Sequence, residues 1–276
     1  MTPFRSAALH AVLDSIPDRV IACSGGIDSL LLAYTAHRAS PAHTWVAHAV
    51  SPAVPSEATA RVKYWAAQEG WQLALVDSGE FADENYLRNP VNRCYYCKRN
   101  LYGSLHRMNS VVTSSTKAVV FSGANLDDLG EYRPGLIAAS ENGVRHPFIE
   151  AEFSKQDIRD MARHAGLPFA DLPASPCLSS RLYTGTRVTA QRLRAVEAGE
   201  ALIRQATGLA VVRCRIRDNE VLVETPSADR HRINAVLIEQ LSATMRAIDS
   251  NIMSVSVDAL PYKSGRAFLI EKLAAT

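Results

Sequence analysis

The stretch VIACSGGIDSLLL, from Val20 to Leu32, decides the fold of this chain. An apolar run, a Ser-Gly-Gly turn and a second apolar segment follow one another, and this order predicts a strand, a phosphate-binding loop and a helix. Paired glycines let the backbone turn tightly and bring successive N–H groups close to an anion, and the helix adds the positive end of its dipole. The alternative is an ordinary turn between a strand and a helix.

The polar side chains of this loop suit a phosphate and its metal ion. Gly25 and Gly26 form the turn, and Ser24 and Ser29 offer hydroxyl donors. Asp28 cannot favour a phosphate directly, because both groups are negative. We therefore expect Asp28 either to cap the helix or to hold Mg²⁺ on the phosphate.

The elements that follow the loop alternate between helix and strand. We expect a helix over 28–39, a strand over 44–50, a helix over 56–69 that Ser56 caps and Gly70 closes, and strands over 71–76 and 118–123. Such alternation at short spacing predicts an α/β fold with a doubly wound parallel sheet of the Rossmann-like kind. Ligands bind these sheets at the carboxyl ends of the strands, and the phosphate loop lies at one such end.

A second polar segment follows the strand over 118–123. Asn125, Asp127 and Asp128 place an amide and two carboxylates at the carboxyl end of that strand, at the edge that also carries the phosphate loop. A nucleotide or metal site is one interpretation. A solvated turn is the other, because Asn and Asp suit turns in any case.

A Pro- and Ser-rich segment, residues 172–181, separates two patterns. After it we expect a helix from Thr189, strands over 210–217 and 220–225, a helix from Ser227 and a strand over 252–258. We therefore predict two domains. Residues 1–185 form the phosphate-binding domain, and residues 186–276 form a smaller α+β domain for substrate binding or oligomerisation.

The composition is that of a globular protein. The chain has 276 residues, of which 47% are hydrophobic and 21% charged, and its formal net charge is +2. Nucleic-acid binding is not expected from so mild a charge. No apolar run approaches the ~18 residues of a membrane helix, and the first residues lack a signal-peptide core, so we expect a cytoplasmic enzyme without membrane association.

The five cysteines divide into two groups. Cys23 and Cys214 lie in apolar strand patterns and are expected to be small core residues. Cys94 and Cys97 form a Cys-x-x-Cys pair, and Cys177 lies in a polar loop. This pattern favours metal or redox chemistry over a disulfide framework.

Three loop cysteines are compatible with zinc, a redox dithiol or an iron–sulfur cluster. Structural zinc normally takes four protein ligands, so His106 or His146 would have to complete a zinc site. A [4Fe–4S] cluster on three cysteines leaves one iron open, which suits catalysis. The residues alone do not choose between these groups.

Two features of the C-terminal part concern charge. Arg213, Arg215 and Arg217 alternate along one predicted strand and share a face, where bound anions would relieve their mutual repulsion. A solvated edge strand is the alternative. Glu200 falls on the apolar stripe of the helix from Thr189, so its carboxylate needs either an arginine partner or a role in acid–base catalysis.

Together these motifs resemble the LarE family of sulfur transferases in the PP-loop ATP pyrophosphatase superfamily, whose members split ATP between the α and β phosphates. The resemblance spans nearly the whole chain. It rests on SGGIDS at 24–29, Ser51-Pro52 with Pro55 and Glu57, RCYYCK at 93–98, GANLDD at 123–128, YRPG at 132–135 and PCLSSR at 176–181.

The resemblance implies adenylation and thiolation of a small mononucleotide. LarE-type enzymes use ATP and Mg²⁺ to adenylate a carboxylate of pyridinium-3,5-biscarboxylic acid mononucleotide, release pyrophosphate and replace AMP by sulfur, in making the nickel-pincer nucleotide of lactate racemase. ATP would then be bound by Ser24, Gly25, Gly26, Asp28, Ser29, Asn125, Asp128 and Arg133, with Mg²⁺ on Asp28. The substrate phosphate would be bound by Ser180, Arg181, Arg213 and Arg215.

The family supplies sulfur in two ways. In one, a single cysteine at the position of Cys177 gives up its sulfur and becomes dehydroalanine. In the other, three cysteines bind a [4Fe–4S] cluster whose open iron carries a labile sulfide. Cys94, Cys97 and Cys177 match the three-cysteine form, with sacrifice of Cys177 as the alternative. Sulfide or a sulfur-donating protein would renew the sulfur, and Glu200 would join the cysteines as a catalytic residue.

Two other classes of protein share the loop and the cysteines. A tRNA-thiolating PP-loop enzyme would need an RNA-binding module and a stronger basic face. A nucleotide-binding redox sensor would need no turnover. We also expect the protein to form a homo-oligomer.

Overall fold

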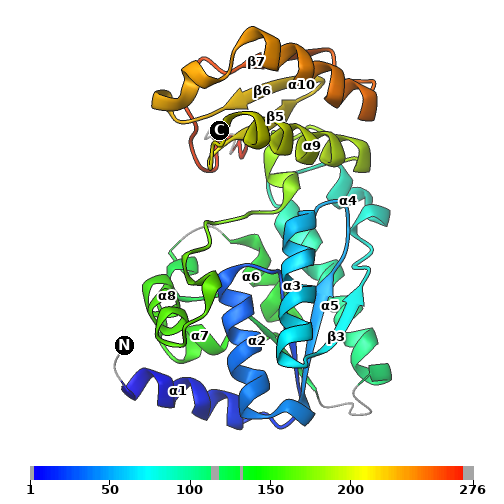
Figure 1. Cartoon of the computed structure of the whole chain (residues 1–276). Coiled ribbons are helices and arrows are strands. Elements are labelled where there is room, and N and C mark those ends of the chain that lie inside the picture. Colours follow the sequence, from blue (N-terminus) through cyan, green and yellow to red (C-terminus); the bar gives the residue numbers. More distant parts are fainter. Residues whose placement is uncertain (1–2, 113–117, 131–132, 270–276) are drawn as a thin grey trace, which may run out of the picture. The chain divides into compact units, whose positions relative to one another are not determined.

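The computed structural model describes residues 3–112, 118–130 and 133–269, and the chain divides into two compact units. The first unit comprises residues 1–80 and 94–175, and the second comprises residues 81–93 and 176–276. These bounds differ from the ranges drawn on the sequence, because residues 81–93 and 176–185 pack with the second unit. The elements of both units are labelled in Figure 1.

The first unit is built on a four-stranded parallel sheet of order β3-β2-β1-β4. The strands are β1 (Arg19–Ala22), β2 (Thr44–Ala49), β3 (Gln72–Val76) and β4 (Val119–Ser122). The register pairs Ile21 with Val46 on one side and with Phe121 on the other, so the strands are aligned at their carboxyl ends. The predicted α/β fold with a Rossmann-like parallel sheet is confirmed.

Helices cover this sheet. They are α1 (Pro3–Asp14), α2 (Ile27–Ala39), α3 (Ser56–Glu69), α5 (Arg93–Val112), α6 (Pro134–Glu141), α7 (Pro147–Glu150) and α8 (Lys155–His164), with short 3₁₀ turns η1 (Pro41–His43), η2 (Glu80–Ala82), η3 (Leu126–Asp128) and η4 (Pro168–Asp171). Among the described helices of the whole chain, none has the length and apolar character needed to span a membrane.

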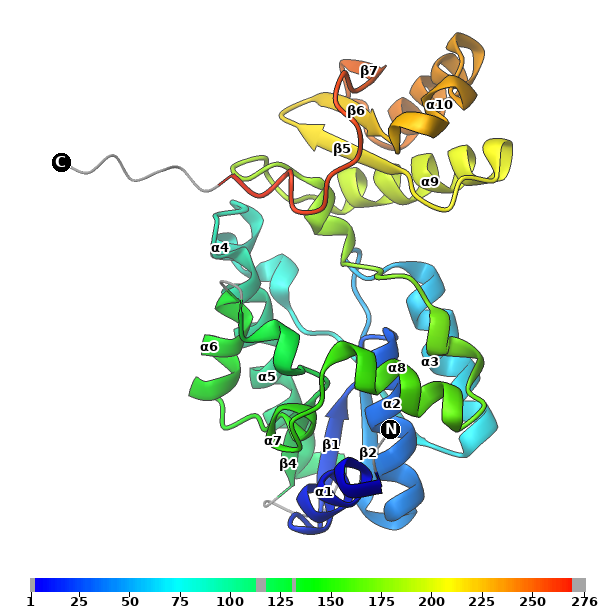
Figure 2. The same cartoon turned by 90° about the vertical axis from the view of Figure 1, so that its left-hand side faces the viewer.

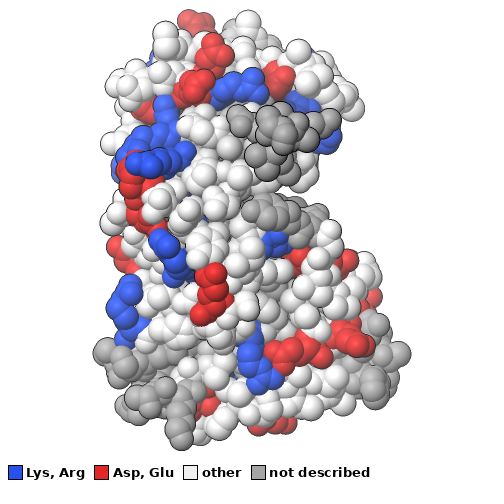
Figure 3. Space-filling view, turned by 180° about the vertical axis from the view of Figure 1, so that it is seen from behind, with Lys and Arg blue, Asp and Glu red and all other residues white. Residues whose placement is uncertain are grey.

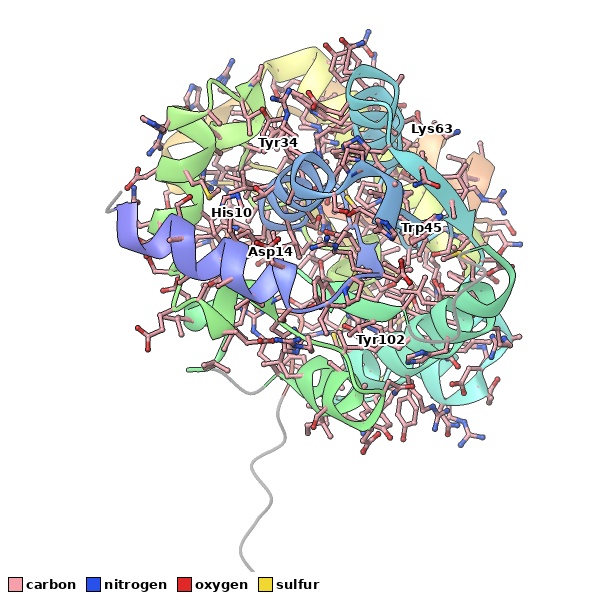
Figure 4. The ribbon with its side chains drawn as sticks, turned by 90° about the horizontal axis from the view of Figure 1, so that it is seen from below. His10, Asp14, Tyr34, Trp45, Lys63 and Tyr102 are labelled. Carbon is pink, nitrogen blue, oxygen red and sulfur yellow. The ribbon has the colours of Figure 1, made fainter. Side chains whose placement is uncertain are left out.

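Both faces of the sheet carry an apolar cluster. Side chains alternate along β1, so Ile21 packs into a cluster with α1, α2 and α3, whereas Val20 packs into a cluster with Tyr102 and Leu105 of α5. Figure 2 shows α2 and α3 on one side of β1 and β2 and α5 on the other. In Figure 4, Tyr34 of α2 and Tyr102 of α5 likewise lie on opposite sides of the sheet. Burial on both faces explains why the strands read as continuous apolar runs.

The second unit contains a smaller sheet of order β5-β6-β7. Strands β5 (Arg213–Arg217) and β6 (Glu220–Glu224) form an antiparallel hairpin, and β7 (Ser254–Val257) pairs with β6 in parallel. Helices α9 (Ala190–Thr207) and α10 (Ala235–Ile248) pack on each other, and the unit also holds α4 (Glu84–Leu87), η5 (Leu178–Arg181) and η6 (Ser227–Arg232).

Segment 81–93 is held in the second unit by buried polar contacts. The Asn89 amide nitrogen donates to the carbonyl oxygens of Tyr183 at 2.8 Å and Thr186 at 2.9 Å. The hydroxyl groups of Tyr86 and Ser179 lie 2.7 Å apart. The sequence predicted one domain boundary, near residue 185. These contacts between residues distant in the sequence are the reason that residues 81–93 also belong to the second unit.

Helix starts differ from the predictions at two places. Helix α3 begins at Ser56 as expected, but its N-cap is Pro55 and not Ser56, while Gly70 closes it in the left-handed conformation with φ 67°. The helix expected from Ser227 is a 3₁₀ turn there. The α-helix α10 starts only after Asn234. The Asn234 side chain accepts a hydrogen bond from the Leu237 amide at 2.9 Å, and this N-cap favours a helix start at that position because the first amides of a helix have no partner within it.

Candidate active site

The loop between β1 and α2 has the backbone of an anion site. Gly25 has φ 81°, and a Cβ there would lie 2.7 Å from the Ala58 carbonyl oxygen of α3, so only glycine fits. Gly26 is the N-cap of α2 and provides no side-chain cap. The first turn of the helix is closed by the Leu30 amide donating to the Gly26 carbonyl at 3.0 Å. The amides of residues 27–29 precede this bond, and amides at this position of a helix have no carbonyl partner within it, which is why helix N-termini suit anions.

The two loop serines have different environments. The Ser29 hydroxyl is buried; it donates to the Gly26 carbonyl at 3.1 Å and accepts from the Ser24 amide at 3.0 Å. Ser29 therefore braces the loop from within. Ser24 is exposed, with its hydroxyl 3.1 Å from that of Ser29. Both were predicted as hydroxyl donors, and of the two it is Ser24 that is accessible.

Side chains of strand β2 and helix α3 contact the backbone of the phosphate loop. His48, which is buried, places Nδ1 2.8 Å from the Cys23 carbonyl oxygen and Nε2 2.8 Å from the Thr59 hydroxyl. The Arg61 guanidinium donates to the Gly25 carbonyl at 2.6 Å. None of these contacts could be predicted from the sequence. The one feature of the sequence that could have indicated them is His48, a polar residue within an apolar strand.

Burial lowers the pKa of His48. A neutral imidazole is therefore favoured in the folded state. The stability that it contributes is present above the unfolded-state pKa of about 6.5 and is lost as the pH falls through the lower folded-state pKa.

We expect the free energy of unfolding to fall more steeply between about pH 7 and pH 5 in the wild-type protein than in His48→Gln, because glutamine does not titrate. Urea denaturation at each pH measures the two slopes. The pKa of His146 is also lowered by burial, but that group is common to both proteins. Parallel slopes would contradict the prediction.

Asp28 is paired with a lysine that the sequence analysis did not single out. Lys155 Nζ lies 2.7 Å from Oδ1 and 2.6 Å from Oδ2 of Asp28. Burial raises the pKa of the Asp28 carboxyl, Lys155 opposes that shift, and nearby Asp128 adds to it. Asp28 is not the N-cap of α2, because Gly26 holds that position, and Asp28 lies instead in the first turn of the helix.

The end of β4 lies against the start of α2. A Cβ at Gly123 would be 2.8 Å from the Ser29 amide nitrogen, so only glycine allows this approach. The Asn125 side chain accepts from the Asp127 amide at 3.0 Å, and Asp128 accepts from the Asn125 amide at 3.1 Å. Asp128 also pairs with Arg133 at 3.0 Å. The expected ATP-binding residues of this segment are therefore brought beside the phosphate loop within the first unit.

The cysteines are all free thiols. Cys94 is exposed and Cys97 half-buried in the first turns of α5, and Cys177 is exposed at the N-cap of η5. Cys94 and Cys97 belong to the first unit and Cys177 to the second. Cys23 and Cys214 are buried, and burial raises the pKa of both thiols, that of Cys23 to about 11. These two are core residues, as predicted.

The side chains of the described residues do not form a cluster of metal ligands. Among residues 3–112, 118–130 and 133–269, no group of three or more His, Cys, Asp or Glu side chains is placed to hold a metal ion. Both histidines considered for zinc have other partners. His106 contacts the Asn142 carbonyl oxygen at 2.9 Å, and His146 contacts the Ser122 hydroxyl at 2.7 Å.

In the second unit, Glu200 is paired with arginine. Its two oxygens accept from Arg181 at 2.9 and 3.0 Å, and the Cys214 amide donates to it at 3.2 Å. Glu200 and Arg181 are both almost fully buried. Arg181 also donates to the carbonyl oxygens of Pro176 at 2.8 Å and Cys177 at 3.3 Å, so the pair fixes the backbone on both sides of Cys177.

The three arginines of β5 differ in their burial and in their partners. Arg215 is buried, and its three nitrogens donate to Glu224 at 2.7 Å and to the carbonyl oxygens of Ser180 and Lys263 at 3.1 and 3.0 Å. Arg217 is exposed and stacks over the Tyr183 ring at 4.1 Å.

Like the exposed Arg217, Arg213 has no carboxylate partner among the described residues. It is half-buried, stacks over the Tyr262 ring at 5.5 Å and donates to the Val212 carbonyl at 2.7 Å. Burial lowers its pKa, and the neighbouring charges of Arg181 and Arg215 act in the same direction. An anion bound at Arg213 would relieve both effects.

Comparison with known proteins adds the family. No protein-family model matches the chain. The chain is 35% identical over 248 residues to the uncharacterized protein slr1717 of Synechocystis sp., covering 90% of each chain. It is 29% identical over 263 residues to the pyridinium-3,5-bisthiocarboxylic acid mononucleotide synthase of Lactiplantibacillus plantarum, covering 95% of this chain and 93% of that one. The chain belongs to the LarE family.

The chain is also 25% identical over 245 residues to the uncharacterized protein MJ0830 of Methanocaldococcus jannaschii, covering 89% of this chain and 90% of that one. On the face of the LarE-family chain drawn in Figure 3, basic side chains are interspersed with acidic ones.

Proposed function

We propose that the protein is an ATP-dependent sulfurtransferase. It adenylates the carboxylates of pyridinium-3,5-biscarboxylic acid mononucleotide and replaces AMP by sulfur to give thiocarboxylates. The observation that carries the proposal is the phosphate loop braced by Ser29 and His48, together with the similarity to a pyridinium-3,5-bisthiocarboxylic acid mononucleotide synthase over 95% of the chain. The product in that synthase's name contains thiocarboxylates, which carboxylates can form only after activation.

The residues of the first unit fit a magnesium nucleotide. The amides of residues 27–29 would bind its phosphates, and the Asp28 carboxylate, with Asp128 nearby, would hold Mg²⁺. Mg²⁺ supplies Lewis-acid stabilisation of charge on the departing pyrophosphate. The chain itself contributes preorganised amides and a loop whose carbonyl groups are fixed by His48 and Arg61. No side-chain nucleophile is needed for adenylation.

In this proposal the second unit supplies the substrate site and Cys177, whereas Cys94 and Cys97 belong to the first unit. Arg213 binds the substrate phosphate together with Ser180, whose hydroxyl contacts Arg181 and whose carbonyl contacts Arg215. Arg181 and Arg215 shape the site through their contacts with Glu200 and Glu224. Glu200 then acts as a positioning residue for the Cys177 turn. Sulfur comes from a [4Fe–4S] cluster on Cys94, Cys97 and Cys177, or in the alternative from Cys177 itself.

The test of this function is pyrophosphate release. Protein with ATP and Mg²⁺ is expected to release pyrophosphate only when the mononucleotide is added, and mass spectrometry of the product should show oxygen replaced by sulfur. Release that is independent of the mononucleotide, or stimulated by tRNA, would contradict the assignment.

Arg213→Ala is expected to raise the KM for the mononucleotide by about ten- to one-hundredfold, because a charged hydrogen bond in a half-buried site is worth about 1.5–3 kcal/mol. The KM for ATP should change little, because the phosphate loop is built from other residues. Steady-state kinetics with each substrate varied in turn measures both constants. Arg217→Ala, on the same strand but exposed, is the control and should leave both near the wild-type values. Equal effects of Arg213→Ala on the two constants would refute the role.

A further inference from the structure

The chain segment after β7, residues 258–269, is fixed to the sheet of the second unit by ion pairs. Arg266 lies between two carboxylates: its Nη1 is 3.4 Å from Oε1 of Glu224 and 3.4 Å from Oδ2 of Asp258. The Glu224 side chain has no exposed surface, and that of Arg266 is 15% exposed. Figure 2 shows the segment in red, where it passes β5 on its way from β7. The segment is therefore an ordered part of the second unit.

Further contacts place Tyr262 and Lys263 next to arginines of β5. The Arg213 guanidinium stacks over the Tyr262 ring, 5.5 Å from its centroid. The Tyr262 amide donates to the Thr225 carbonyl at 2.8 Å. The Lys263 carbonyl oxygen accepts from Arg215 Nη2 at 3.0 Å. The backbone of Lys263 is consequently held beside the strand that carries Arg213, while its side chain is exposed to solvent.

The buried carboxylates around β5 already have arginine partners. The pairs are Arg181–Glu200, Arg215–Glu224 and Arg266–Glu224. Among the described residues, neither Arg213 nor Lys263 has a carboxylate partner. A phosphate monoester carries about −1.5 to −2 charges at pH 7 and has three acceptor oxygens, so a single cation does not neutralise it. Two cations on adjacent segments match such a group in charge and in the number of donors.

We propose that Lys263 binds the substrate phosphate together with Arg213, and that the two cations make the enzyme select the mononucleotide over the riboside that lacks the phosphate. The inference rests on the proposed function, in which Arg213 binds this phosphate. Tyr262 is a positioning residue, because its ring contacts Arg213 and its backbone carries the chain into Lys263. The pyridinium ring and its two carboxylates are common to both compounds, so the preference between them depends on the phosphate site.

The experiment is calorimetric titration of the full chain, without ATP, with two probes used separately: pyridinium-3,5-biscarboxylic acid mononucleotide and its riboside. Lys263→Met is expected to weaken binding of the mononucleotide by about tenfold, the lower end of the range for a charged hydrogen bond, because this side chain is exposed to water and salt. Binding of the riboside should not change. Lys263→Arg retains the charge and should bind the mononucleotide within about threefold of the wild-type protein.

A double variant separates a shared phosphate site from an effect on folding. Arg213→Ala combined with Lys263→Met should bind the two probes with equal affinity, because no cation is left to recognise the phosphate. A loss of folding would instead weaken the binding of both probes. Arg194→Met is the matched control, since Arg194 is an exposed cation of α9 in the same unit and donates to the Ala190 carbonyl of its own helix. This control should leave both affinities unchanged.

Equal affinities of the wild-type protein for the two probes would overturn the inference. So would a Lys263→Met variant that binds both probes as tightly as the wild-type protein, or one that loses both together.

Failure of the proposed function is recognised separately. In that case Lys263 would support selective binding of the mononucleotide, and yet the wild-type protein would release no pyrophosphate from ATP in its presence. Substrate-dependent release of pyrophosphate with an unaltered preference in Lys263→Met would instead preserve the function and reject the role of Lys263.

Discussion

Glu224→Met is expected to lower the free energy of unfolding by about 3–5 kcal/mol, because it leaves a buried arginine without its carboxylate. Glu224 has no exposed surface, and its Oε2 accepts from Arg215 Nε at 2.7 Å. After the substitution, Arg215 keeps only carbonyl oxygens as partners. Chemical denaturation followed by circular dichroism measures the loss.

Removal of both charges should be much less harmful than removal of one. Arg215→Met combined with Glu224→Met replaces the ion pair by apolar groups and is expected to recover most of the lost stability. Glu84→Gln is the control, because it removes an ion pair that is exposed to solvent. Glu84 contacts Arg187 at 2.6 Å, and the midpoint of unfolding of this variant should hardly change. A Glu224→Met variant within about 1 kcal/mol of wild type would contradict the prediction.

Sulfur transfer by Cys177→Ala is expected to be abolished whichever way the sulfur is supplied, whereas the effect of Cys94→Ala distinguishes the two. Cys94 and Cys97 are three residues apart on α5, so both thiols face the same side of the helix and can bind one group. If they hold a [4Fe–4S] cluster with Cys177, anaerobic reconstitution should give about four irons and charge-transfer absorption. Each of the three Cys→Ala changes should then remove both signals.

Sacrifice of Cys177 would give a different pattern. Protein mass would fall by about 34 Da, the mass of H₂S, after one turnover, and Cys94→Ala and Cys97→Ala would stay active. Cys214→Ala is the control in both cases, because Cys214 is buried in β5. Intact-protein mass and iron content after one anaerobic turnover are the two measurements. An unchanged mass in iron-loaded protein supports the cluster, and a loss of mass in iron-free protein that tracks product formation contradicts it.

The local pattern of the sequence was sufficient for the first unit. The apolar run before Ser24 and the paired glycines predicted a strand, a tight loop and a helix, and the structure contains β1, a loop with Gly25 at φ 81° and α2. Short β-α-β spacing then allowed only a parallel sheet with helices on both faces. The reason is that chain stiffness, apolar periodicity and the conformational freedom of glycine act over a few neighbouring residues.

The partners of charged side chains could not be predicted in this way. The Asp28–Lys155 pair joins residues 127 positions apart, and the contact of Asn89 with Tyr183 spans 94. On β5, alternation places Arg213 and Arg215 on one face. The register of the β5–β6 hairpin sets Glu224 opposite Arg213, yet Glu224 pairs with Arg215, its diagonal neighbour. The sequence by itself therefore determined the strands of the first unit, their parallel sheet and the position of the loop after β1. Only the tertiary structure decided which charged side chains are paired within the protein, because such pairing depends on distances that arise when remote segments pack together.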